Sequence, residues 1–447
     1  MGALHHVHDA RPRLMPHVPD LVEAVERVWR IPHPGPANLL ADPRFLKLAG
    51  ALTQRCGEEK IAFSLSNALR NLGLPCAMRS GAPLAADDFG AIAAALERAF
   101  SASTTTRRHL CPLDLADELP ALSFGRARID RFSANDLQTL FGRHRLERVY
   151  SGRPVDFGRL AQLQWLVVEE TAEIDPRPEA RAIPILFELM GRDIGAFDPL
   201  ARRYPAAVEQ ALFALLLAPW EDWATMLEVD WRSFRLPWVY TVDDDLAVQP
   251  MAPPDSEALT FEPVIYHDNY GEEIEDERPS ILPLEDGSLT QLEHAIAEAW
   301  RKLEASRGCE LFQTPIEHFL VRAYLSDGID ELLAHMTVLE AALGEEADHD
   351  RKLRPKPERN LSATDRMARK IAGLLGDQTA ADAYRALFKI RSLFIHGRAG
   401  LSTISTEQKV MARQLSRRVV NALLDQAAAG APSRADVLAQ QLARGAP

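Results

Sequence analysis

An arginine and a histidine stand five residues apart in the C-terminal part of the chain. Arg391 carries a permanent positive charge and a planar fork of N–H donors that suits phosphate oxygens. His396 belongs to the residue type that can both accept and release a proton near neutral pH. Together these two side chains indicate acid–base chemistry at a negatively charged group, such as a phosphodiester.

The pattern around this pair predicts the helix that must position it. Apolar residues recur at helical spacing before Arg391, and Gly397 directly follows His396. Glycine tolerates the left-handed conformation that ends many helices. Five residues on a helix, at about 100° per residue, separate two side chains by roughly 140°. We therefore expect the two side chains to share one site only because the helix ends at Gly397.

Two upstream segments with helical patterns accompany the pair. Residues 332–344 read LLAHMTVLEAALG, and residues 365–376 read DRMARKIAGLLG. With ALFKIRSLFIHG at 386–397, these ordered motifs resemble the Apea-like branch of the HEPN superfamily. The superfamily signature is an arginine followed after four to six residues by a histidine. The resemblance covers residues 290–430, about a third of the chain.

The resemblance implies a metal-independent endoribonuclease that needs no cofactor. His396 would assist the ribose 2′-hydroxyl in its attack on the neighbouring phosphorus, or protonate the leaving oxygen. Arg391 would stabilise charge on the phosphoryl oxygens. Ser392 stands where many superfamily members carry Asn, Asp or His, and is the third catalytic candidate. The expected products carry 2′,3′-cyclic phosphate ends.

The resemblance also implies partners and a biological role. Superfamily members place two such helices across a two-fold axis, so we expect a homodimer through the C-terminal bundle. HEPN ribonucleases often serve as toxins or antiviral effectors, which suggests that the regions before the bundle sense a trigger that the sequence does not identify. The alternative is a non-catalytic dimerisation or ligand-binding scaffold, in which Arg391 pairs with a carboxylate and His396 is structural.

RNA contact would need a local basic surface, because the chain has a formal net charge of −13. Lys389 and Arg398 flank the pair and are candidate RNA-binding residues. Further cations cluster just ahead of the expected helix: Arg351, Lys352, Arg354, Lys356, Arg359, Arg366, Arg369 and Lys370. Of this cluster, we expect Arg366, Arg369 and Lys370 to bind RNA.

The chain is long enough for two or three domains. We expect a mostly α-helical fold with a mixed α/β middle region and a C-terminal HEPN-like α-helical bundle. The expected parts are a helical N-terminal region (1–118), a mixed α/β domain (119–265), an acidic and Pro-rich linker (266–287), the bundle (288–430) and a flexible tail (431–447). Within the middle region, an alternating pattern predicts a strand over 122–132. Residues 164–169 and 232–240 also read as strands, whereas 101–108 reads as a polar connection.

Other features bear on metals and location. Four cysteines are scattered without a CxxC pair, and no ligand cluster suited to a catalytic metal accompanies Arg391. The beginning of the chain lacks the layout of a signal peptide, and no apolar run reaches membrane-spanning length. We therefore expect a cytoplasmic protein with no metal site and no membrane contact. Four tryptophans cluster in the sequence, and their apolar neighbours favour packing in the core over stacking on unpaired bases: Trp220, Trp223, Trp231 and Trp238.

Overall fold

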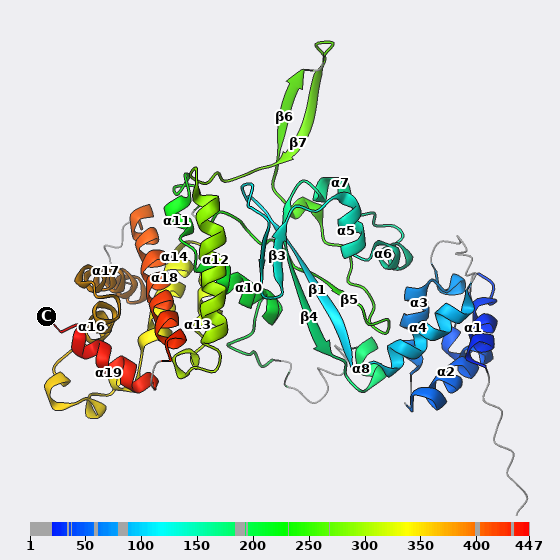
Figure 1. Cartoon of the computed structure of the whole chain (residues 1–447), viewed down its shortest axis with the longest axis horizontal. Helices are drawn as coiled ribbons and strands as arrows, with labels where there is room; N and C mark the ends of the chain where they lie inside the picture. Colours follow the sequence, from blue (N-terminus) through cyan, green and yellow to red (C-terminus); the bar gives the residue numbers. More distant parts are fainter. Residues whose placement is uncertain are drawn as a thin grey trace, which may run out of the picture.

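The computed structural model describes residues 20–33, 35–36, 38–57, 61–78, 88–183, 193, 195–230, 232–267, 269–397, 403–430 and 433–446. Figure 1 shows three parts in a row: N-terminal helices, a central β-sheet with helices on it, and a C-terminal helical bundle. A two-stranded hairpin projects from the central part. The expected fold class, mostly helical with a mixed middle region, is confirmed at this level.

The N-terminal helices have a core of their own. They are α1 (Leu21–Trp29), α2 (Pro43–Cys56), α3 (Ala62–Leu72) and α4 (Phe89–Ser101). Asp20, Asp42 and Asp88 cap α1, α2 and α4, because each carboxylate accepts a hydrogen bond from a backbone N–H of the first turn. The buried apolar side chains of this part, including Leu48 and Leu65, pack among themselves. A short helix, α8 (Pro178–Ala182), lies against α3.

The central sheet is antiparallel throughout. Its strand order is β2 (Leu122–Phe124), β3 (Ala127–Asp130), β4 (Gln164–Glu173), β1 (Thr104–Leu113) and β5 (Tyr240–Asp243). The two long strands, β1 and β4, pair along their whole length, from Thr104 opposite Glu173 to Leu113 opposite Gln164. They form the middle of the sheet, and β2 and β5 form its edges.

The sheet corrects several sequence expectations. The strand over 164–169 is confirmed, but 122–132 forms a hairpin that turns at Gly125. Gly125 has a φ of +57°, and a Cβ there would lie 2.0 Å from the Trp300 ring, so only glycine fits. The segment 101–108 is not a connection, since β1 begins at Thr104. Threonine is polar but β-branched, and pairing with β4 decides its conformation.

Two boundaries change as a result. The sheet begins at Thr104, within the region expected to be helical up to residue 118, so the N-terminal helices end at Ser101. Of the strand expected over 232–240, only Tyr240 joins the sheet. Pro237 has no N–H to donate to a neighbouring strand, while Phe234 and Leu236 reach the core from irregular chain.

The C-terminal part is a bundle of helices. They are α12 (Ser288–Ala305), α13 (Ile316–Leu325), α14 (Gly328–Leu343), α16 (Ala363–Leu375), α17 (Gln378–Ile395), α18 (Thr406–Ala428) and α19 (Arg434–Arg444), with a single turn, α15 (Glu346–His349), between α14 and α16. Residues 315–395 are all described and contain no strand, which confirms the helical prediction for this region. Its membership of the HEPN superfamily stays a prediction.

The end of the chain is not the flexible tail expected over 431–447. In its described part, α19 packs on α16 and buries Val437, Leu438 and Leu442. The two helices approach so closely that a Cβ on Gly373 would lie 1.9 Å from the carbonyl oxygen of Gln441. Apolar residues at helical spacing therefore outweigh the Ala- and Pro-rich composition that suggested mobility.

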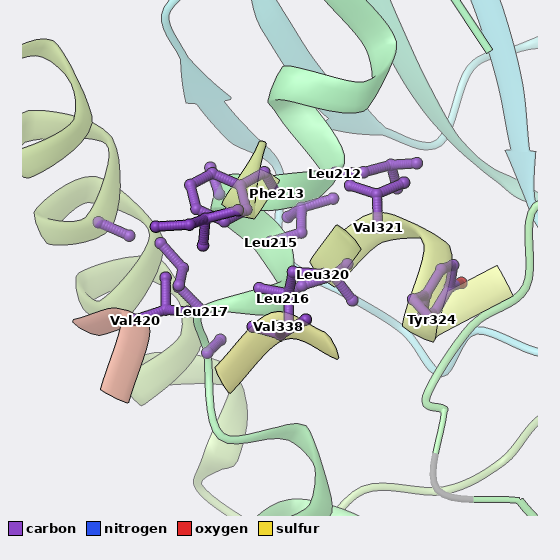
Figure 2. Close-up of a cluster of buried hydrophobic side chains, with 14 of the residues drawn as sticks. Leu212, Phe213, Leu215, Leu216, Leu217, Leu320, Val321, Tyr324, Val338 and Val420 are labelled. Atoms are coloured by element: carbon purple, nitrogen blue, oxygen red, sulfur yellow. The ribbon is translucent and has the colours of Figure 1, made fainter. Parts of the chain in front are cut away.

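Helices cover both faces of the sheet. On one face, α5 (Ala134–Leu140), α6 (Arg143–Val149) and α7 (Phe157–Leu160) pack near Trp165 and Val167. On the other face lies α10 (Ala206–Leu216), which contacts β4 as well as α12 and α13. Eight residues of α10 are buried. Figure 2 shows Leu212, Phe213 and Leu216 of α10 among side chains of the bundle: Leu320, Val321, Tyr324, Val338 and Val420.

The helix α11 (Trp220–Trp223) follows α10, and both of its tryptophans are buried, as predicted. Trp238 is only half-buried, and Trp231 lies outside the described residues. The acidic linker expected over 266–287 is largely ordered. Its acidic run lies in β7 (Glu273–Pro279), which pairs with β6 (Phe261–His267) as the projecting hairpin of Figure 1. No helix within the described residues is long and apolar enough to cross a membrane.

Buried polar side chains join α14, α18 and α11. The Arg413 guanidinium donates to Glu331, and Arg417 donates to Glu221 of α11. His335 Nδ1 lies 2.8 Å from Ser416 Oγ. Burial, together with the nearby guanidinium groups, lowers the pKa of His335 to about 3. This imidazole is therefore neutral in the folded protein.

Acid should destabilise the protein through His335. Below about pH 6.5 the unfolded chain takes up a proton on this residue that the folded chain does not take up. The contribution of His335 to the free energy of unfolding therefore has its full value above that pH. It falls by up to about 1.4 kcal/mol per pH unit as the pH drops below it. Urea unfolding at several pH values gives the free energy of unfolding as a function of pH. Below about pH 6.5 this free energy should fall less steeply with decreasing pH for His335→Gln than for wild type. The exposed His294 provides the control, and equal slopes for all three proteins would contradict the assignment.

Candidate functional site

The helix α17 ends where its sequence predicts. Asp377 caps its beginning, and its side chain accepts a hydrogen bond from the N–H of Thr379 at 2.9 Å. At the other end, His396 is the C-cap residue, and Gly397 adopts a φ of +57°. The N–H of Gly397 donates to the carbonyl oxygen of Phe394, which closes the last turn. The histidine is therefore presented at an open helix end.

Arg391 is half-buried and held from two sides. Its Nη1 lies 3.5 Å from Oε1 of Glu340, which belongs to α14 and to the first motif of the family resemblance, residues 332–344. Its guanidinium carbon lies 5.6 Å from the ring centroid of Phe388, one turn earlier on α17. Both partners remain partly exposed, so solvent weakens this ion pair. The contacts orient the guanidinium without enclosing it.

His396 is exposed, and Ser392 is half-buried. Within the described part of the chain, the His396 imidazole has no hydrogen-bond or ionic partner, and nothing links it directly to Arg391 or Ser392. The sequence expectation that Arg391 and His396 lie at the same helix end is met, but the structure does not join them into one hydrogen-bonded unit. Burial of His396 against a carboxylate would favour the scaffold alternative, but it does not occur among the described residues.

A groove of about 440 Å³ runs beside the motif, between α17 and the start of α18. Lys389 and Ile390 line it from α17, and Ile404 and Met411 line it from the other side. Lys389 is exposed, as a residue that contacts a ligand must be. Arg398, the other flanking candidate, lies outside the described residues.

Apolar side chains crowd the exposed end of α17. Phe394 is 41% exposed and Ile395 is 53% exposed. They lie in the same turn that carries His396. Large apolar side chains grouped at a surface mark an interaction site more often than isolated ones do. The end of α17 therefore combines an acid–base group, a cation and an uncovered apolar surface.

The basic cluster ahead of α17 is different from what its sequence suggests. Arg366 is 2% exposed and Lys370 is fully buried, so the prediction that they bind RNA is wrong. Arg366 bridges Glu345, Asp348 and Glu358, and Lys370 bridges Glu345 and Asp348. Burial alone would raise the pKa of Asp348, but Lys370 and Arg366 outweigh it and lower that pKa. These cations hold the segment between α14 and α16 in place.

The rest of the cluster consists of one buried, one half-buried and four exposed residues. Arg354 is buried and donates to the carbonyl oxygens of Ala347, Asp348 and Leu361. Arg369, predicted to bind RNA, is half-buried. The exposed cations are Arg351, Lys352, Lys356 and Arg359.

A second polar site escaped the sequence analysis. A cavity of about 600 Å³ lies beside the edge strand β5, and its wall includes His109, Thr241 and Glu170. His109 Nδ1 lies 2.9 Å from Thr241 Oγ1, and its Nε2 lies 3.2 Å from Glu170 Oε1. Burial lowers the pKa of His109. Because its two partners are 132 and 61 residues away in the chain, no sequence spacing predicts this cluster.

Among the described residues, no three His, Cys, Asp or Glu side chains are grouped so that they could hold a metal ion. A comparison with protein-family models finds no match, and no curated protein and no solved structure matches the chain. The resemblance to the HEPN superfamily therefore rests on the three motifs and their order.

The buried ion cluster gives a stability prediction. Replacing Lys370 with Met leaves Glu345 and Asp348 with fewer positive partners inside the protein, which should cost about 3 kcal/mol of unfolding free energy. Replacing the half-buried Arg369 with Met should cost less than about 1 kcal/mol, because this residue forms no ion pair within the described part of the chain. Urea unfolding measures both variants. A Lys370→Met protein as stable as wild type would show that the cluster contributes little.

Proposed function

We propose that the chain is a metal-independent endoribonuclease that acts in the cytoplasm, with Arg391, Ser392 and His396 as its catalytic residues. The observation that carries the proposal is the exposed imidazole of His396 at the end of α17, which has no partner among the described residues. A histidine kept for structure would be expected to pack or to pair. An exposed histidine at the same helix end as an arginine is open to a substrate phosphate.

The proposed reaction uses the ribose 2′-hydroxyl as nucleophile. One histidine takes its proton while the 2′-oxygen attacks the adjacent phosphorus, and the bond to the 5′-oxygen breaks as that oxygen takes up a proton. Arg391 donates N–H groups to the phosphoryl oxygens as charge develops on them. Ser392 lies one residue further along the helix and supplies a hydroxyl that can hold the scissile phosphate. The products are a 2′,3′-cyclic phosphate and a 5′-hydroxyl.

One copy of the motif supplies a single acid–base group, whereas this reaction needs a proton both removed and delivered. We therefore propose a homodimer in which two α17 ends meet and a second copy supplies the other histidine. The exposed Phe394 and Ile395 support this arrangement, because a second copy would cover them. Lys389 and Arg369 remain the RNA-binding candidates with described positions.

The parts before the bundle would regulate this activity, as in a toxin or an antiviral effector whose trigger they sense. The alternative is a non-catalytic dimerisation or ligand-binding scaffold. One observation favours it: Arg391 already lies near a carboxylate, that of Glu340. An exposed pair of this kind is weak, so a phosphate can displace the carboxylate.

Substitution of the motif tests the enzymatic proposal. His396→Ala should lower the rate of RNA cleavage by roughly 10²–10⁴-fold, and Arg391→Ala by roughly 10²–10³-fold. Arg391→Lys should restore little activity, because lysine lacks the planar fork. The reaction should proceed in EDTA and leave 2′,3′-cyclic phosphate ends, which gel analysis of labelled RNA identifies. Arg385→Ala is the control, since Arg385 lies on α17 but pairs with Asp382. Unchanged cleavage by the Ala variants would leave the scaffold alternative.

The dimer has its own test. Replacing Phe394 and Ile395 together by Glu should convert the dimer to monomers, because two carboxylates would be buried at the contact. Leu46 of α2 is 54% exposed, and Leu46→Glu should leave the mass unchanged. Light scattering measures the mass of each protein. A wild-type protein that is monomeric at all concentrations, with and without RNA, would contradict the proposed arrangement.

A further inference from the structure

The hairpin of β6 and β7 has few interactions that could stabilise it. Each strand has seven residues, yet none of the hairpin residues with a described burial is buried. A two-stranded hairpin with no core is marginal in water. This one also exposes Tyr270 at 91%, Ile265 at 58% and Tyr266 at 42%. Figure 1 shows it standing clear of the rest of the molecule.

The strand register sorts the hairpin side chains onto two faces. Glu273, Glu275 and Glu277 alternate along β7 and so share one face, at spacings of roughly 7 Å. Ile265 lies opposite Glu275 on the same face. We call these four residues the acidic face. Like charges at this spacing repel one another, so the acidic face lowers the stability of an already marginal hairpin.

The base of the hairpin is nevertheless anchored to the body. Arg159 of α7 lies 3.0 Å from Glu277, and its guanidinium carbon lies 4.1 Å from the centroid of the Phe261 ring. The N–H of Ser280 donates to the carbonyl oxygen of Thr260 just outside the strands. The chain thus holds a poorly stabilised, charged hairpin in a defined position, which suggests that the hairpin serves a contact.

The same chain carries a surface of matching chemistry. Residues 351–359, here called the basic loop, expose Arg351, Lys352, Lys356 and Arg359, and no ion pair occupies these four cations among the described residues. Leu353 lies among them and is 52% exposed. The loop is held by the buried Arg354, whose three hydrogen bonds to carbonyl oxygens measure 2.6–2.7 Å. Both surfaces therefore place like charges around one exposed apolar side chain.

These two surfaces cannot meet within one molecule. Figure 1 shows the hairpin projecting beyond one side of the molecule, while the yellow segment that precedes α16 lies on the opposite side of the bundle. A separation seen in projection is a lower limit to the real distance. A contact between the acidic face and the basic loop must therefore involve two copies of the chain.

We propose that the acidic face of the β6–β7 hairpin docks on the basic loop of a second copy of this chain. Glu273 and Glu275, which have no cation partner among the described residues, pair with cations of the basic loop, and Ile265 contacts Leu353. The contact is independent of the proposed association through α17. It buries the aliphatic side chains that the isolated molecule exposes and offsets the repulsion along β7.

Charge exchange tests the contact. The measurement is the sedimentation coefficient of the full chain as a function of concentration, with Phe394→Glu and Ile395→Glu present in every protein to suppress association through α17. This parent should self-associate, and less so as ionic strength rises from about 0.05 M to about 0.5 M. Glu273→Lys with Glu275→Lys should weaken association roughly tenfold or more, and so should Lys352→Glu with Lys356→Glu. A mixture of these two variants should associate again, because each repaired pair regains opposite charges.

The control exchanges exposed carboxylates elsewhere, with Glu228→Lys and Glu293→Lys, and should associate like the parent. Circular dichroism of each variant checks that the fold is retained. A parent that stays monomeric, or a mixture that fails to associate, would overturn the proposal. If the loop variant loses RNA binding but associates normally, the basic loop is an RNA surface and the proposal is also overturned. RNA cleavage is measured separately on the chain that retains Phe394 and Ile395, because the ribonuclease proposal requires the α17 contact. Failure of that proposal therefore remains distinguishable from failure of this one.

Discussion

The burial of α10 is the constraint on which the rest of the architecture depends. Eight of the residues of α10 are buried, and a helix buried on most of its surface needs packing partners on several sides. The sheet covers one side of α10 through β4, while α12, α13 and the buried residues of α14 and α18 cover the others. The middle region and the C-terminal bundle consequently share one continuous core. The N-terminal helices have a separate core, and hydrogen bonds from Asn71 to the carbonyl oxygens of Leu246 and Val248 tie them to the middle region.

Inside the bundle, charged side chains do structural work that apolar packing cannot do. Arg366 and Lys370 tie α16 to the chain that leaves α14, and Arg413 and Arg417 tie α18 to α14 and α11. Such groups tolerate few alternative arrangements, because each must keep its partners. They surround α17 with fixed neighbours. The end of α17 thus combines a rigid support with a fully accessible tip, which is the usual construction of a site that must be positioned accurately and still reach a ligand.

The sequence predicted the features that depend on local pattern. Apolar spacing and glycine stops located the bundle helices, including the end of α17 at Gly397, and the strand-like residues at 164–169 located β4. It failed where distant partners decide. The threonines at the start of β1 read as a loop until β4 is placed beside them, and the acidic run of β7 reads as a linker until β6 pairs with it. Arg366 and Lys370 read as surface cations because Asp348, 18 and 22 residues away, showed no sign of being buried. The proposed ribonuclease chemistry also involves a second copy of the chain, whose position no pattern within one sequence describes.

The position of α10 in the chain also affects how the protein is made. Its neighbourhood is completed only by α18, where Asn421 donates to the carbonyl oxygen of Leu217, 204 residues later. At the speeds at which ribosomes work, that interval lasts on the order of 10–40 s. During that time a helix with eight side chains that become buried in the folded protein has left the ribosome without its partners. We therefore expect a chain truncated before α18 to expose apolar side chains of α10 that the complete bundle covers.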